Sequence, residues 1–247
     1  MTRMRNGGRA LIAVLLLLTG GCDFAGVDPV GNTDFIAAEP FRLTLSADGI
    51  AALRVAAING EITIVGSATA DSIVATGERR VGSDSQEDAE RHLHDLTVSL
   101  RQLNDQATLA TDQPDRSGGR DYTVDYRIVM PAAMALTFEH VNGDVQASGL
   151  QGEVAMSLVN GTLDVETSVK PARPLDLSVV NGQILLGIPA STSADFEAHV
   201  VNGSIGLTNL QLDDFEGTTR SMTGRLGGGG IQIALDVVNG TILVRGL

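Results

Sequence analysis

Aromatic residues are scarce in this chain of 247 residues, which contains no Trp, 2 Tyr and 6 Phe. Proteins that bind single-stranded nucleic acid, or sugars, by stacking present exposed aromatic rings, so the composition argues against both functions. The formal net charge is −13, with 17 basic against 30 acidic residues. A nucleic-acid partner is therefore not expected, because such proteins carry a basic face.

Cysteine is almost absent as well, because Cys22 is the only one. It follows three arginines, the apolar run from Ala10 to Leu18, and a pair of glycines. Basic, apolar and small residues in this order are typical of a secretory signal. The run is too short to span a bilayer, which takes about 20 residues.

A lone cysteine at this position resembles the lipobox of bacterial lipoproteins. The resemblance implies cleavage of residues 1–21, a diacylglycerol on the Cys22 sulfur, and a membrane as partner through the lipid anchor. Thr19 stands where leucine is usual, so plain signal cleavage is the alternative. Residues 22–40 show no helical or strand periodicity and are predicted to be the lipid anchor and a flexible tether. The predicted anchor indicates a location in the bacterial cell envelope.

The dipeptide Asn-Gly recurs six times, and apolar residues alternate with polar ones on both sides of each copy, which is the period of β-strands. Glycine and asparagine tolerate a positive φ better than other residues, so each copy is expected to close a tight turn. The predicted structural turns are Asn59 and Gly60, Asn142 and Gly143, Asn160 and Gly161, Asn181 and Gly182, Asn202 and Gly203, and Asn239 and Gly240.

Two topologies satisfy this repeat. Antiparallel hairpins would pair the residue two places before each Asn with the residue three places after it. A β-solenoid or β-helix-like stack would instead place each copy on the next one, 18 or 21 residues later in the middle of the chain. The shared register of six copies favours the stack, because equivalent side chains then form ladders, and the six Asn would form a hydrogen-bonded ladder of their own.

Two insertions interrupt the repeats. Residues 84–95 predict a small helix that begins after Ser85, with Ala89, Leu93 and Leu96 toward the core. Strands are predicted at 96–103, 107–111 and 121–130 and an exposed loop at 112–120, and the glycines at 227–230 predict a wide turn. The expected fold class is therefore all-β, with one small helix inside a single domain at 41–247.

The segment Ala-Glu-Arg-His-Leu at 89–93, the strand that ends at Pro131 and the Val-Asn-Gly strands behind it resemble a known family. This is the family of bacterial envelope β-solenoid domains called putative adhesins, a domain of unknown function related to the head domains of auto-transporter adhesins. The resemblance covers about 41–247. It implies the fold and an adhesin-like role, and it brings no catalytic motif.

The sequence contains no motif that would group side chains into a catalytic or metal-binding site. His92 and His94 lie two residues apart and do not share a helix face, and Asp213, Asp214 and Glu216 lack the spaced ligands of a calcium loop. We expect no catalytic residue, metal or cofactor, and a non-enzymatic envelope protein with a binding or scaffold surface for an unknown partner. The alternatives are a carbohydrate-active β-helix enzyme, which needs two carboxylates in a groove, and a periplasmic accessory or envelope-stress protein.

Overall fold

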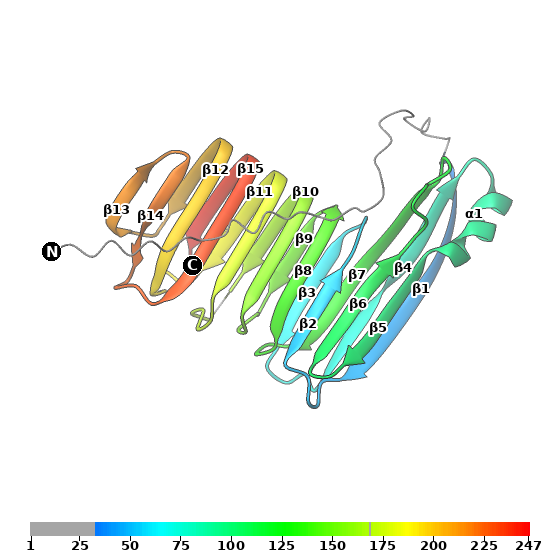
Figure 1. Cartoon of the computed structure of the whole chain (residues 1–247), viewed down its shortest axis with the longest axis horizontal. Coiled ribbons are helices and arrows are strands. Elements are labelled where there is room, and N and C mark those ends of the chain that lie inside the picture. The colour runs from blue at the N-terminus through cyan, green and yellow to red at the C-terminus, as the bar shows by residue number, and fades with distance from the viewer. Residues whose placement is uncertain (1–32, 168) are drawn as a thin grey trace.

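The structure, a computed structural model, describes residues 33–167 and 169–247; the predicted signal, Cys22 and most of the predicted tether lie outside them. Within these residues the protein is all-β with one short helix (Figure 1). The elements are β1 (Phe35–Ser46), β2 (Ala52–Ala56), β3 (Ile62–Ser67), β4 (Ser72–Ser83), α1 (Gln86–His92), a 3-10 turn (Leu93–Asp95), β5 (Thr97–Leu103), β6 (Gln106–Asp112), β7 (Asp121–Pro131), β8 (Ala135–Asn142), β9 (Val145–Ser148), β10 (Val154–Glu166), β11 (Leu175–Ile188), β12 (Ala194–Thr208), β13 (Asp213–Thr218), β14 (Ser221–Leu226) and β15 (Ile231–Gly246).

Each Asn-Gly copy joins two strand segments, which we call the first arm (before Asn) and the second arm (after Gly) of one rung. In β10, β11, β12 and β15 a single long strand contains both arms, whereas β2 with β3, and β8 with β9, form rungs of two separate strands. The first arms pair side by side in the order β2, β8, β10, β11, β15, β12. The second arms pair in the corresponding order, from β3 through β9 to β12.

Neighbouring rungs are parallel and in register, so Asn160 pairs with Asn181 and Asn181 with Asn239. The hairpin alternative is therefore wrong for these strands. The prediction of positive φ at both turn residues is wrong too, because only the glycines have it, with φ from 126° at Gly60 to 146° at Gly203 and Gly240. The chain bends at Asn-Gly instead of reversing, and in β10, β11, β12 and β15 the strand continues through the bend.

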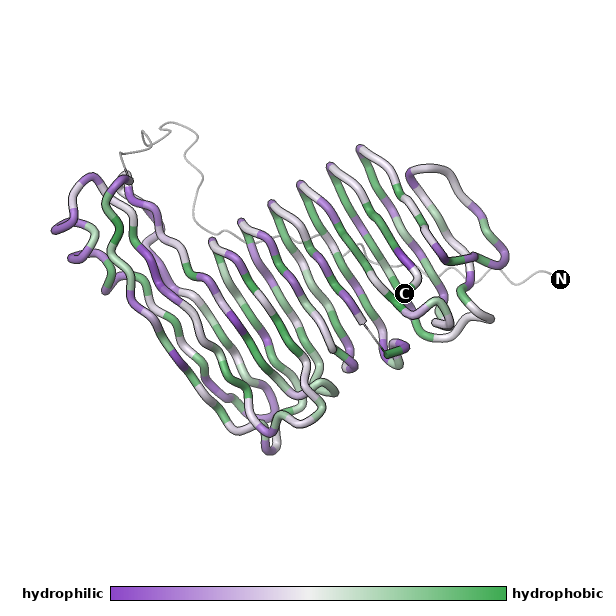
Figure 2. Tube along the Cα trace, turned by 180° about the vertical axis from the view of Figure 1, so that it is seen from behind, coloured by the Kyte–Doolittle hydropathy of each residue, from purple (hydrophilic) through white to green (hydrophobic). Residues whose placement is uncertain are grey.

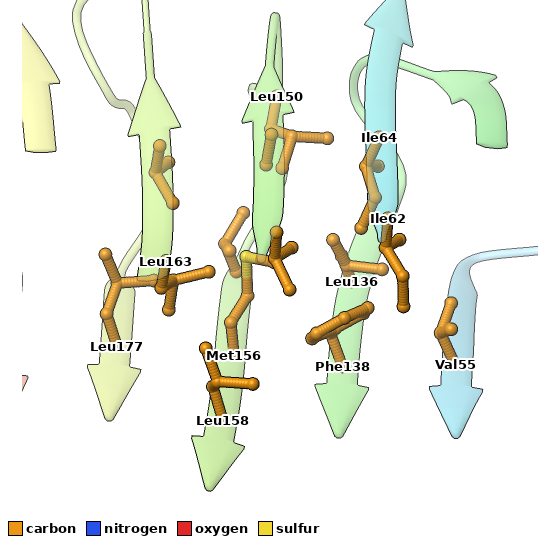
Figure 3. Close-up of a cluster of buried hydrophobic side chains, with 14 of the residues drawn as sticks. Val55, Ile62, Ile64, Leu136, Phe138, Leu150, Met156, Leu158, Leu163 and Leu177 are labelled. Carbon is orange, nitrogen blue, oxygen red and sulfur yellow. The ribbon is translucent and has the colours of Figure 1, made fainter. Parts of the chain in front are cut away.

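The bend directs both arms toward one core. Leu158 and Leu163 are five residues apart and would lie on opposite faces of a straight strand, yet both are buried. The alternation on the two arms is visible along the rungs in Figure 2. Figure 3 shows the result, with Ile62 and Ile64 of a second arm near Leu136 and Phe138 of a first arm. Leucine, isoleucine and valine make up most of this core.

The order of rungs departs from the chain order at the end of the stack. A stack that follows the sequence would pair β11 with β12, but β15 lies between them and pairs with both (Figure 1). Asn181 therefore has Asn239 as its neighbour, 58 residues later, and Asn202 forms the outermost rung. All rungs share the same pattern, so the sequence spacing alone does not specify which copy follows which.

The predicted helix is confirmed at the other end of the molecule. Ser85 caps α1, because its hydroxyl accepts a hydrogen bond from the Asp88 N–H at 3.3 Å, and Ala89 and Leu96 are fully buried. The predicted domain start at 41 is too late. Strand β1 begins at Phe35 and pairs with β4 along its whole length, and Pro40 is tolerated because β1 is an edge strand.

The second insertion forms the hairpin of β13 and β14, which pairs with the first arm of β12. Gly227, Gly228, Gly229 and Gly230 all have positive φ and connect this hairpin to β15, as the predicted wide turn. The hairpin covers one half of the outermost rung and leaves the other half uncovered.

Candidate interaction surface

The six Asn side chains form one continuous ladder of hydrogen bonds along the corner of the stack. Five of the six Nδ2 groups donate to the Oδ1 of the next Asn, at 2.7 to 2.9 Å. The ladder runs from Asn202 through Asn239, Asn181, Asn160 and Asn142 to Asn59. Five successive amide–amide hydrogen bonds make the corner rigid, because each bond polarises its neighbours.

The glycines beside the ladder are required by close backbone contact as well as by φ. A Cβ on Gly182 would lie 1.8 Å from the Gly161 carbonyl oxygen, and a Cβ on Gly240 would lie 1.7 Å from that of Gly182. No side chain fits between rungs at this spacing. Asn-Gly is therefore the signature of a corner at which two strand backbones stack directly.

The two ends of the ladder differ. At one end Asn59 donates to the Tyr122 carbonyl of β7 at 2.9 Å, so the ladder is closed by another strand. At the other end the Asn202 Oδ1 accepts no hydrogen bond from any described residue. We call the rung of β12 the open end.

The open end exposes a strand edge. Over Ser204–Thr208 β12 pairs with β15 on one side, and no described strand pairs with its other side. The Ile205 N–H points outward and bonds to the Thr219 carbonyl in the hairpin turn. Because successive residues of a strand alternate sides, the N–H and C=O of Leu207 point the same way as those of Ile205. Such groups are a template for another strand.

Apolar side chains surround this edge. Val201 is 56% exposed and Leu243 48% exposed, and Val238 and Leu247 are exposed beside them. Gly206 leaves room next to Leu243, because a Cβ there would lie 3.0 Å from the leucine Cδ2. Apart from Arg245, the second-arm face of the last three rungs therefore presents uncharged residues.

Charges near the open end lie elsewhere. The first-arm face of β11, β15 and β12 displays Asp176, Asp236, Asp195 and Glu197. On the second-arm face Arg245 reaches across Gly187 and pairs with Glu166 at 2.7 Å. The second-arm strip beside the free strand edge is therefore weakly charged, in a protein with net charge −13.

One hollow of about 470 Å³ lies beside the ladder and contains Glu61, Asp125 and Asp144. It is open, and its aspartates are engaged in the backbone: Asp125 accepts from the Glu61 N–H at 2.9 Å and pairs with Arg80, and Asp144 accepts from the Thr162 N–H at 2.8 Å. These carboxylates hold neighbouring rungs together.

Within the described residues no three His, Cys, Asp or Glu side chains are grouped to hold a metal ion. His92 instead contacts Asp95, at 2.6 Å, on the surface of the helix. Asp214 pairs with Arg225 across the hairpin. Over the same residues no helix is long and apolar enough to cross a membrane.

One histidine is buried in the core. His140 stands two places before its Asn, in a column of small and aliphatic residues that includes Ala57 and Leu158. Its Nε2 donates to the Gly60 carbonyl at 3.0 Å, and its Nδ1 is buried without a partner. Burial lowers the pKa of His140, which therefore stays neutral near pH 7.

The fold is an open all-β stack, and it is similar to that of a known structure. A crystal structure described as a putative cell adhesion protein from Clostridium sporogenes ATCC 15579 superposes with a TM-score of 0.59 at 12% identity, over 85% of this chain and 100% of that one. A putative adhesin from Bacteroides fragilis NCTC 9343 reaches a TM-score of only 0.26 at 6% identity, over 85% and 97%, and carries no argument. No known family profile and no curated protein matches the sequence.

The exposed edge could not be identified from the sequence. Its residues follow the same pattern as those of the inner rungs, and only the insertion of β15 between β11 and β12 leaves the second arm of β12 outermost. The sequence did identify the six Asn of the ladder, although it predicted tight turns with positive φ at both residues, and the structure has bends with positive φ only at the glycines.

Proposed function

We propose that this protein is a non-enzymatic adhesin-like binding module of the bacterial cell envelope, built as a β-solenoid-like stack and tethered to the membrane through a lipid on Cys22. The observation that carries the proposal is the free edge of β12 at Ser204–Thr208, flanked by exposed Val201 and Leu243. Exposed strand edges are normally blocked by charge or cover, whereas this one carries no charged side chain and is covered only at Ile205, whose N–H bonds to the hairpin turn. The fold shared with the Clostridium sporogenes protein supports the adhesin-like role.

The partner that fits this surface is an extended polypeptide segment that adds as a strand. Main-chain hydrogen bonds to the edge give such complexes their affinity, and alternate side chains give specificity. Here alternate side chains would meet the strip that contains Leu243. Acidic segments are disfavoured, since the molecule is strongly acidic.

The edge is tested by two substitutions at one position. Leu207→Pro removes an outward N–H, whereas Leu207→Ala keeps it and removes only side-chain packing. In cells that lack the native protein, we expect adhesion to be restored by the wild type and by Leu207→Ala, and not by Leu207→Pro at equal protein level. Equal adhesion with both variants would exclude strand addition at this edge.

The anchor and the absence of catalysis need their own tests. Incorporation of a palmitate analogue should depend on Cys22, so the Cys22→Ala variant should remain unlabelled and leave the membrane fraction.

The purified protein should show no hydrolase or lyase turnover on envelope polysaccharides. A turnover lost on substitution of Glu61, Asp125 or Asp144 would favour the carbohydrate-active alternative instead.

A further inference from the structure

Asn-Gly pairs are chemically labile. The backbone nitrogen of the glycine attacks the Asn Cγ, the side-chain amide leaves as ammonia, and a succinimide ring forms. Water then opens the ring to aspartate or isoaspartate, so that the net change is an amide and water giving an acid and ammonia. Glycine allows the attack most readily because it has no Cβ, and such asparagines limit the durability of proteins.

The inner rungs protect their Asn-Gly pairs in two ways. The glycine N–H that must attack is engaged with the next rung, as Gly60 N–H donates to the Asn142 carbonyl at 3.0 Å and Gly143 N–H to that of Asn160 at 3.1 Å. The parallel in-register pairing repeats this arrangement along the stack. The Asn amide is also held on both sides by the ladder.

Asn202 lacks both protections on its outer side. Two N–H groups of β12 that point away from β15 bond to the hairpin turn: Val200 donates to the Arg220 carbonyl and Ile205 to the Thr219 carbonyl. The glycine N–H of an inner rung points to the next rung, as at Gly60 and Gly143, and no described rung follows β12, so the Gly203 N–H points outward without a next-rung acceptor. The Asn202 Oδ1 has no donor there either, and residues 201–204 are exposed to water.

We infer that Asn202 is a modification site, at which the folded protein deamidates spontaneously while the five inner Asn-Gly pairs are preserved. The Gly203 nitrogen is the nucleophile, the Asn202 side chain loses ammonia, and solvent water completes the reaction.

The product changes the open end. A carboxylate at position 202 cannot donate to the Asn239 Oδ1, which the Asn202 amide now contacts at 2.8 Å. Two acceptors then face each other, and isoaspartate also adds a methylene to the backbone of β12. The outermost rung loosens, and a negative charge appears beside the weakly charged strip.

The test follows all six sites in the full-length protein. The folded chain is incubated in mildly alkaline buffer made with heavy-oxygen water, and conversion at each Asn-Gly pair is measured by mass spectrometry of its peptides. We expect conversion at Asn202 to exceed that at every inner pair by about tenfold or more, because an inner rung must first open locally. In denaturant the six rates should become similar.

A matched variant separates position from local sequence. Residues 200–204 differ from residues 237–241 only at Ser204, so Ser204→Thr gives Asn202 the same neighbours as Asn239. Fast conversion at Asn202 and slow conversion at Asn239 in this variant would support the inference. Equal conversion at the two sites, faster conversion at an inner pair, or the same ranking in denaturant would overturn it.

Discussion

The stack of rungs and the N-terminal end around α1 are held together in different ways. In the stack the same contact recurs at every rung, through one Asn, one Gly and a few aliphatic residues. Around α1 each contact occurs once and joins distant residues: Arg120 binds Asp88 at 2.6 Å, and Arg79 binds Glu39 at 2.6 Å. Because the contacts repeat, any rung of the stack can lie next to any other. The N-terminal end instead depends on individual ion pairs.

The largest effect is expected from a Cβ between two rungs. Gly182→Ala places a Cβ 1.8 Å from the Gly161 oxygen and should lower the free energy of unfolding by about 3–5 kcal/mol, because the rungs must separate. Gly49→Ala is the control, since Gly49 also has a positive φ, 72°, but nothing lies within 4 Å; a loss of about 1–2 kcal/mol is expected there. Urea denaturation measures both, and equal losses would show that the spacing of the rungs is not limiting.

The ladder itself is tested by removing one Asn. Asn160→Ala deletes two side-chain hydrogen bonds, those to Asn142 and Asn181, and each such bond contributes about 0.5–1.5 kcal/mol, so we expect a loss of about 1–3 kcal/mol. Asn202→Ala deletes a single bond at the open end and should cost less than half as much. Urea denaturation measures both losses, and an equal loss of stability for the two variants would contradict this prediction.

His140 makes one rung sensitive to acid. Its pKa is lowered by burial, so the unfolded chain takes up a proton below about pH 6.5 more readily than the folded one. Stability should therefore fall as the pH drops from about 6.5 toward the lower pKa of the folded state. His140→Leu matches Leu158 of the next rung and should remove this dependence and add about 1 kcal/mol at neutral pH, as it removes an unpaired Nδ1. Melting curves of the wild type and of His140→Leu at several pH values measure this dependence, and an equal loss of stability in both at low pH would contradict it.

The smallest global effect is expected from the N-terminal end. Hydrogen bonds from Arg120 and Ser83 hold the pKa of Asp88 well below its usual range. The stability that this pair provides is present above about pH 4, the pKa of an unperturbed aspartate, and is lost as the pH falls below it. Asp88→Asn should expose the amides of residues 84–96 to hydrogen exchange and leave those of β10 and β11 unchanged, and uniform exchange over both regions would contradict a separate N-terminal end.

This difference also explains what could be predicted. The alternation around each Asn reports local burial, so the strands, the helix cap at Ser85 and the Asn ladder were predictable from the sequence. The bend was not, because Asn-Gly is equally compatible with a hairpin, and only the unbroken parallel register of Asn160 with Asn181 distinguishes the two. The unpaired Nδ1 of His140 and the pairing of Phe35 with Ser83 depend on contacts between distant residues, and local pattern carries no information on these.

The position of β15 has a consequence for how the chain assembles. During synthesis β12 leaves the ribosome before β15, at a time when the edge of β11 is free and has the same register as its eventual neighbour. We expect β11 to pair first with β12, a pairing that would have to dissolve before β15 could enter between them. Non-local strand pairing is intrinsically slow, so we expect a late folding step in which the last rung is displaced by one place, and a transient species with its outer strand exposed to neighbouring chains.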